Sequence, residues 1–138
     1  MSQTNELEIM ERIALDLEGV EESLASSFNT GAEDFNALIR PLSAAGGKRL
    51  RAQLCLLIAN AGTSVERQRI RIAEAVEMLH LATLIHDDVL DQAEIRRGED
   101  TIHMHKGNKV AILSGDYLFA KAFQIVSEMP DMKYLQIF

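Results

Sequence analysis

Three carboxylates stand close together in the sequence, at Asp87, Asp88 and Asp91. In a helix, Asp87 and Asp91 share one face because residues four apart are neighbours, and Asp88 is offset by about 100°. Like charges at this spacing repel, and near a helix C-terminus the macrodipole adds to the cost. A Mg²⁺ ion that bridges carboxylates to phosphate oxygens would relieve this repulsion, because magnesium prefers oxygen ligands. By themselves, the three residues also fit a solvated acidic patch.

Two cationic clusters flank these carboxylates in the sequence. Arg96 and Arg97 follow them, and guanidinium groups are suited to bidentate binding of phosphate. The run GGKRLR at residues 46–51 places adjacent glycines and a cationic cluster at a helix start, where exposed amides favour anions. It lacks the spacing and the Ser/Thr of a Walker A loop. One acidic and two basic clusters together predict a diphosphate-binding site.

Three segments carry a resemblance to a known family: GGKRLR, HLATLIHDDVLDQAEIRRG and GNKVAILSGDYLFA. Their order and spacing are similar to the first half of trans-polyprenyl diphosphate synthases, over roughly residues 36–129. The resemblance implies a prenyltransferase that condenses isopentenyl diphosphate with an allylic diphosphate. The implied steps are ionisation of the allylic diphosphate, attack by the double bond of isopentenyl diphosphate, and loss of a proton. A homodimer or heterodimer is also implied.

The resemblance assigns roles to individual residues. The family's first aspartate-rich motif binds magnesium and the allylic diphosphate, which implies metal binding and catalysis by Asp87, Asp88 and Asp91. Arg96 would help to bind the allylic diphosphate. The family's isopentenyl diphosphate pocket corresponds to four basic residues, Lys48, Arg51, His80 and Arg97. His80 lies two helical turns before Asp87, on the same helix face.

The residues just before the aspartates bear on product length. In this family the floor of the elongation pocket lies one to two turns upstream of the first aspartate, and bulky aromatic residues there resemble short-chain enzymes. Ala82 and Thr83 are small, and Leu79 lies one turn deeper. The pattern resembles medium- to long-chain synthases, which implies a medium- or long-chain polyprenyl diphosphate as the product.

Helices are expected to position these groups, since two prolines and eight glycines leave long uninterrupted stretches. Apolar residues recur with helical spacing and mostly on one face. The expected helices span roughly residues 5–28, 34–39, 50–61, 70–95, 110–129 and 132–138. The predicted fold class is therefore all-α, a helical bundle, which the resemblance specifies as the N-terminal half of an isoprenoid-synthase-type fold.

Four predicted features of these helices bear on the site. The second helix is expected to end before Pro41. The helix over residues 50–61 is apolar on almost every side and is expected at the centre of the bundle. The long helix that carries the aspartates is expected to run to Ile95, with Gly98 as its C-cap. Residues 99–108 are expected to form a polar loop.

Composition excludes several classes of partner. A formal net charge of −7 repels nucleic-acid backbones, so no nucleic-acid partner is expected. The single cysteine, Cys55, excludes an internal disulfide framework. The N-terminal residues carry no secretion signal, and the apolar runs fall short of the ~20 residues that span a bilayer. A cytoplasmic chain without stable membrane insertion is the expectation.

Other interpretations remain open at this stage. An HD-type metal phosphohydrolase would use His86 and Asp87 with nearby histidines as metal ligands, but it leaves both basic clusters unexplained. A terpene cyclase would share the aspartates but gives no reason for GGKRLR. A non-catalytic or regulatory subunit of a two-component synthase is a further alternative. Since the family's second aspartate-rich motif is absent, residues 1–138 are expected to form a partial isoprenoid-synthase domain, inactive or weak alone.

Overall fold

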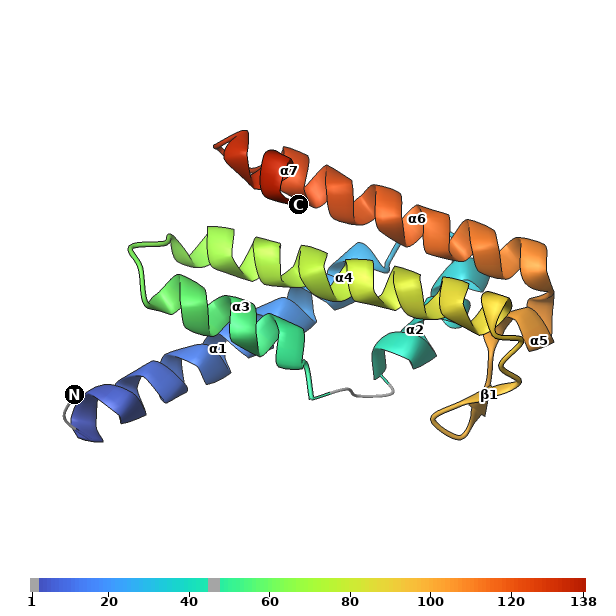
Figure 1. The fold of residues 1–138 in the computed structure, drawn as a ribbon, viewed down its shortest axis with the longest axis horizontal. Helices are drawn as coiled ribbons and strands as arrows, with labels where there is room; N and C mark the ends of the chain where they lie inside the picture. Colours follow the sequence, from blue (N-terminus) through green and yellow to red (C-terminus); the bar gives the residue numbers. More distant parts are fainter. Residues whose placement is uncertain (1–2, 45–47) are drawn as a thin grey trace.

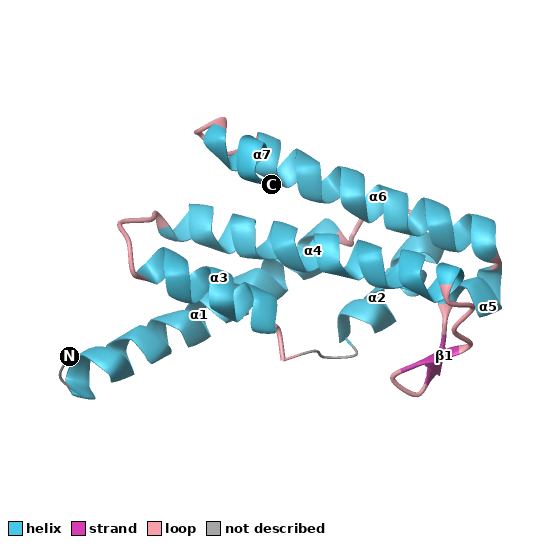
Figure 2. Cartoon of the chain, viewed as in Figure 1, coloured by secondary structure: helices cyan, strands magenta, loops and turns pink. Residues whose placement is uncertain are grey.

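The structure is a computed structural model that describes residues 3–44 and 48–138. Most of the described residues are helical, and one short β-hairpin has two residues in each strand (Figures 1 and 2). The elements are α1 (Gln3–Ser27), α2 (Glu33–Ala44), α3 (Leu50–Asn60), α4 (Glu66–Leu90), β1 (Ile95–Arg96), β2 (Glu99–Asp100), α5 (Ile102–Lys106), α6 (Asn108–Ser127) and α7 (Lys133–Ile137). The predicted all-α fold class is therefore confirmed.

Helix α4 is the central element of the bundle. It packs most extensively along α6 on one side and against α1 and α3 on the other (Figure 1). Its buried apolar residues are Ala73, Ala75, Met78, Leu81, Ala82 and Ile85. Small residues let α6 approach closely, and a Cβ atom added at Gly115 of α6 would overlap the ring of His86. The seam between α4 and α6 is therefore closely packed around the aspartate-bearing end of α4.

Buried ion pairs hold the N-terminal half of α4 to its neighbours. Arg69 donates from Nε to Oδ2 of Asp16 at 2.6 Å and from Nη2 to Oδ1 at 2.9 Å, which joins α4 to α1. Glu74 is fully buried and accepts hydrogen bonds at 2.6 Å from the hydroxyl groups of Ser23 and Ser27. Arg71 donates to the same carboxylate at 2.6 Å. Buried charges are tolerated when they are paired in this way.

Helix α2 differs from the sequence prediction, because it continues through Pro41 to Ala44. A proline inside a helix removes one backbone hydrogen bond and crowds the preceding turn. Leu38 and Leu42 lie on either side of the proline and pack against the apolar core. Burial of these side chains offsets the cost of the proline, so the prediction that the helix ends before Pro41 is wrong.

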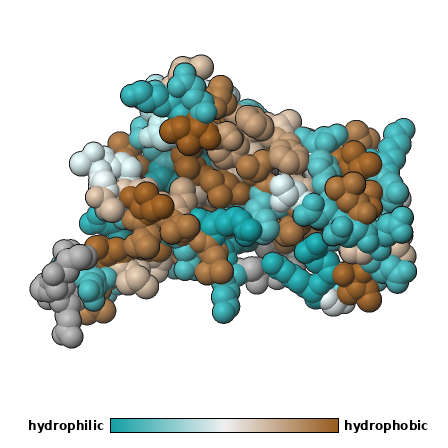
Figure 3. Space-filling model, viewed as in Figure 1, coloured by the Kyte–Doolittle hydropathy of each residue, from teal (hydrophilic) through white to brown (hydrophobic). Residues whose placement is uncertain are grey.

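Helix α3 lies at the edge of the described bundle and not at its centre. Only Ala52 and Leu56 are buried, and they face α1 and α4. The other side of the helix is an exposed apolar surface made of Leu50, Leu54, Leu57 and Ile58, which contributes to the apolar surface visible in Figure 3. The prediction of a central α3 is wrong here because the described helices cover only one of its sides.

The end of α4 also differs from the prediction. The helix stops at Leu90, and the chain turns through Gln92, which has a left-handed φ of 52°. Arg97 and Gly98 have φ values of 54° and 85° and form the two-residue turn of the antiparallel hairpin. Two successive positive φ values suit the right-handed twist of paired strands. Gly98 is therefore a hairpin residue and not a helix C-cap, and the expected polar loop contains β2 and α5.

Helix α6 is long and apolar enough to cross a membrane by length and composition. The sequence analysis predicted this helix over residues 110–129 but counted no apolar run long enough to span a bilayer, because Asp116 and Lys121 interrupt the run. In the structure α6 packs along α4 and buries seven side chains: Ala111, Ser114, Gly115, Leu118, Ala122, Ile125 and Val126. This burial pattern is the one that core helices of globular proteins share.

Candidate functional site

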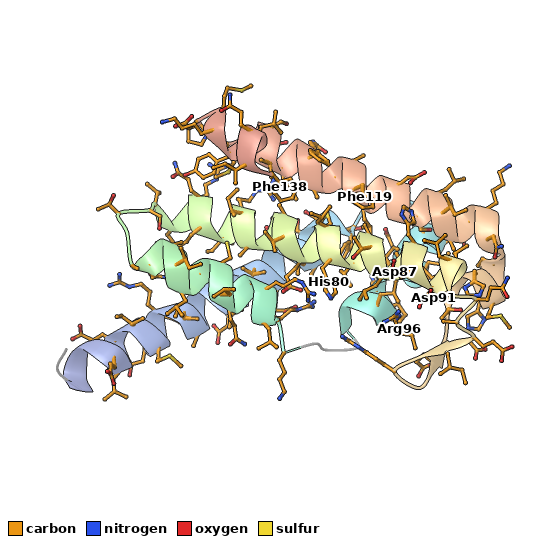
Figure 4. All side chains as sticks on the ribbon, in the orientation of Figure 1. His80, Asp87, Asp91, Arg96, Phe119 and Phe138 are labelled. Carbon is orange, nitrogen blue, oxygen red and sulfur yellow. The ribbon has the colours of Figure 1, made fainter. Side chains whose placement is uncertain are left out.

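The C-terminal half of α4 presents one charged face. Figure 4 shows His80, Asp87 and Asp91 along this half of the helix, with Arg96 nearby on the hairpin. His80, Asp87 and Asp91 recur at spacings of seven and four residues, which places them on the same face. Asp87 and Asp91 are exposed, and no ion pair joins either of them to another described side chain. Both carboxylates are therefore open to a ligand.

Asp88 is separated from the other two aspartates. Its residue is 4% exposed, and its Oδ1 accepts hydrogen bonds at 2.7 Å from Nε and at 2.7 Å from Nη2 of Arg96. The helix turns Asp88 toward the hairpin, about 100° away from the direction of Asp87. Asp88 and Arg96, predicted as a metal ligand and a diphosphate ligand, are thus paired with each other.

The donor set fits magnesium when substrate supplies the remaining ligands. Among the described residues, no group of three His, Cys, Asp or Glu side chains converges closely enough to hold a metal ion. Magnesium is usually held by one or two carboxylates together with phosphate oxygens and water. Asp87 and Asp91 supply two carboxylates of this hard oxygen type.

The pKa of His80 responds to charged residues from separate parts of the chain. It is half-buried, and burial is the main cause that lowers the pKa of His80 below its ordinary value of 6.5. The positive charge of Arg51 lowers this pKa further, Glu77 opposes the shift, and Arg97 and Arg96 add smaller effects. The charges that shift this pKa come from the start of α3, from α4 itself and from the hairpin. The imidazole is therefore neutral near pH 7.

The residues predicted to bind isopentenyl diphosphate come from three elements, and we call them the basic subsite: Lys48, Arg51, His80 and Arg97. Lys48 and Arg51 are exposed at the start of α3. The turn is held in shape because Gln53 donates from Nε2 to the carbonyl oxygen of Lys48 at 2.5 Å. Residues 46 and 47 of the GGKRLR run lie outside the described residues. Within the basic subsite, His80 lies on the same face of α4 as the exposed aspartates.

The three predicted chain-length residues occupy different environments. Ala82 is fully buried and lies one turn before His86, which places it on the side of α4 that faces α6. Leu79 is partly buried against the core. Thr83 is partly buried, and its hydroxyl donates to the carbonyl oxygen of His80 at 2.7 Å. A larger residue at Ala82 would therefore press into the seam between α4 and α6.

A cavity of about 620 Å³ lies behind Asp88 and was not foreseen from the sequence. Helices α2 and α4 supply apolar walls that include Leu38, Leu42 and Ile85, and α5 supplies Ile102. The Asp88–Arg96 pair lines the cavity at its polar edge. Volumes of this size are typical of small-molecule pockets. The spacing of Leu38 and Leu42 signalled a buried helix face, but only the tertiary structure places it opposite α4.

Comparison with known proteins defines the family. A family model described as Polyprenyl synthetase matches residues 32–138, and the chain belongs to this family. The chain is 33% identical over 129 residues to octaprenyl diphosphate synthase of Escherichia coli (strain K12), covering 94% of this chain and 40% of that protein. It is 37% identical over 123 residues to heptaprenyl diphosphate synthase component 2 of Geobacillus stearothermophilus, covering 88% and 38%. The predicted resemblance is confirmed.

Solved structures agree with the sequence relatives. A polyprenyl synthase from Caulobacter crescentus CB15, complexed with calcium and isoprenyl diphosphate, has a TM-score of 0.85 and 37% identity, covering 92% of this chain and 40% of that chain. A decaprenyl diphosphate synthase from Rhodobacter capsulatus has a TM-score of 0.83 and 33% identity, covering 94% and 40%. The chain thus spans about 40% of the length of these relatives.

Proposed function

We propose that the chain supplies the diphosphate-binding face of a trans-polyprenyl diphosphate synthase, which condenses isopentenyl diphosphate with an allylic diphosphate. The observation that carries this proposal is that α4 exposes Asp87 and Asp91 while Arg96 of the hairpin is bonded to Asp88, between them in the sequence. Arginine side chains bind the oxygens of a diphosphate. Carboxylates bind the Mg²⁺ ion that accompanies the diphosphate. The names of the relatives support the same reaction class.

Different residues would bind the two substrates. The basic subsite would bind the diphosphate of isopentenyl diphosphate through Lys48, Arg51 and Arg97, with the neutral His80 as a hydrogen-bond partner. Arg96 would help to bind the allylic diphosphate. Holding both substrates in fixed positions lowers the entropic part of the barrier.

Magnesium fits the acidic part of this face. Asp87 and Asp91 would bind the Mg²⁺ ion together with phosphate oxygens. Asp88 would become a third ligand once Arg96 binds phosphate instead of Asp88. When bound, magnesium neutralises charge on the departing diphosphate. A related polyprenyl synthase complexed with calcium and isoprenyl diphosphate supports the use of a divalent cation.

Binding and turnover test the proposal separately. Isothermal titration calorimetry of the chain with farnesyl diphosphate should show binding that requires Mg²⁺ and weakens when Asp87 is replaced by Asn. Incubation with farnesyl diphosphate, radiolabelled isopentenyl diphosphate and Mg²⁺ then tests turnover, which we expect to be weak or absent for this chain alone. Metal-independent binding, or equal binding by wild type and D87N, would contradict the proposed role of the aspartates.

A second candidate function is that of a non-catalytic or regulatory subunit in a two-component synthase. One relative is named heptaprenyl diphosphate synthase component 2, which favours a heteromeric assembly. The exposed apolar residues Ile112, Leu113 and Phe123 of α6 provide surface for a homodimer or heterodimer. Light scattering distinguishes a dimer from a monomer, and turnover that appears only after a partner chain is added would favour the subunit role.

Product length follows from the residues before the aspartates. The names octaprenyl and decaprenyl among the relatives support a medium- or long-chain product. In an active full-length form, Ala82→Phe should shorten the products, because the new ring would press into the seam between α4 and α6, five residues before Asp87. Ala120→Phe, at an exposed alanine on α6, is the matched control and should leave product length unchanged. Unchanged product length in A82F would sink the proposed role of Ala82.

A further inference from the structure

A buried glutamate, Glu77, joins α4 to the turn that carries the first basic cluster. Its side chain is 5% exposed, and its Oε1 accepts the backbone N–H of Ala52 at 3.0 Å. Its Oε2 lies 3.7 Å from Nη1 of Arg49. Glu77 therefore makes its contacts inside the protein, between α3 and α4, and none of the roles assigned above uses it.

The start of α3 needs such a partner. The first N–H groups of any helix lack acceptors within the helix, and an Asp, Asn, Ser or Thr at the N-cap usually supplies one. Here the N-cap is Arg49, which has a left-handed φ of 47° and makes no capping hydrogen bond with its side chain. Glu77 supplies the missing acceptor from α4, and its negative charge also suits the positive end of the helix dipole.

Arg49 is held from a second direction as well. Its Nε and Nη2 donate to Oε1 and Oε2 of Glu21 at 2.5 and 3.0 Å, which adds α1 to the junction. The capped residue, Ala52, directly follows Arg51 of the basic subsite, and Glu77 lies one turn before His80. The contacts of Glu77 therefore hold the first turn of α3 against the turn of α4 that precedes His80.

We propose that Glu77 is a positioning residue that sets the spacing between Arg51 and His80 and thereby the affinity of the basic subsite for isopentenyl diphosphate. This inference rests on the proposed function of that subsite. Glu77 acts through the helix start and does not touch the ligand. A direct electrostatic role has the opposite sign, because a carboxylate near an anion site repels the anion. Removing Glu77 weakens binding if it positions the subsite and strengthens binding if only its charge matters.

The test is isothermal titration calorimetry with isopentenyl diphosphate in the presence of EDTA, so that the aspartates cannot contribute through a metal. Glu77→Ala should weaken binding about tenfold, the size of one lost hydrogen bond to a charged group. Glu77→Gln keeps an acceptor for Ala52 but weakens the hold on Arg49, so its affinity should lie between those of wild type and E77A. This second variant preserves the test if E77A does not fold, as judged by circular dichroism.

Two further variants make the result specific. Glu74→Gln is the matched control: Glu74 is also buried, lies one turn earlier on α4, and bonds Ser23, Ser27 and Arg71. E74Q should lower the melting temperature but keep the affinity of wild type. Arg51→Ala should weaken binding, and failure of wild type itself to bind would overturn the proposed function. The decisive case is one in which wild type binds isopentenyl diphosphate and R51A binds it more weakly. If E77A and E77Q then bind it as tightly as wild type or more tightly, the proposed role of Glu77 is overturned.

Discussion

The two halves of α4 both carry charged residues but use them for different purposes. In the N-terminal half, Arg69 and Glu74 are paired with partners from α1 or from α4 itself and are shielded from water. In the C-terminal half, Asp87 and Asp91 are exposed on the same helix face as His80. Charges satisfied within the chain stabilise the fold, whereas charges left open remain available to a ligand. Asp88 marks the boundary, because it is buried but lies within the aspartate-rich motif.

The strongest test of the buried half is Arg69→Ala. The substitution leaves Asp16, which is 3% exposed, without its charged partner. Breaking a buried pair in this way costs about 3–5 kcal/mol, and denaturant unfolding measures the loss. Arg67→Ala, at an exposed arginine two residues earlier, should change stability by less than about 0.5 kcal/mol. Equal effects of the two variants would show that the N-terminal half is not held by its buried charges.

The seam with α6 supports the end of α4, and Gly115→Ala tests it. The added Cβ atom would overlap the His86 ring, so the helices must move apart. Overpacking of this kind costs about 1–3 kcal/mol. Gly62→Ala serves as the control, since its new Cβ atom would have an ordinary contact at 3.7 Å with the carbonyl oxygen of Ala59. A G115A protein as stable as G62A would contradict the close packing beside Asp87.

The exposed half should respond in the opposite way to Asp87→Asn. Stability should stay the same or rise by a few tenths of a kcal/mol, because the repulsion with Asp91 is removed. Affinity for magnesium with an allylic diphosphate should fall by at least about tenfold, or 1.4 kcal/mol. Glu94→Gln, at an exposed acid beyond the helix, should leave this affinity unchanged. If D87N lowered the free energy of unfolding and left the affinity for magnesium with an allylic diphosphate unchanged, the proposed difference between the two halves of α4 would be contradicted.

The smallest expected effect comes from His80. Its pKa is lowered in the folded state, mainly by burial and then by Arg51. The unfolded chain therefore binds the proton first as the pH falls below 6.5, so the contribution of His80 to stability is complete above that pH and declines below it. His80→Gln should flatten the pH dependence of the unfolding free energy between pH 5 and 7. An identical slope in wild type and H80Q would contradict the lowered pKa.

Much of the charged face was predictable from local spacing. Asp87, Asp91 and His80 fall on one face of any helix that contains them, and the structure agrees with this prediction. The prediction failed for α3, whose apolar surface is covered on one side only, and for the end of α4, where Gln92 and Arg97 turn the chain into a hairpin. Helix periodicity does not reveal which side of an apolar helix finds a partner.

The sequence by itself determined the all-α class, the family and the shared face of the aspartates, because these depend on residue type and on a repeat of 3.6 residues. Tertiary structure alone decided that Asp88 pairs with Arg96, that Glu77 caps α3, and that Arg69 pairs with Asp16. The last two relations join residues 25 or more positions apart in the sequence. They depend on how helices pack against one another, and the spacing within a single helix carries no record of that packing.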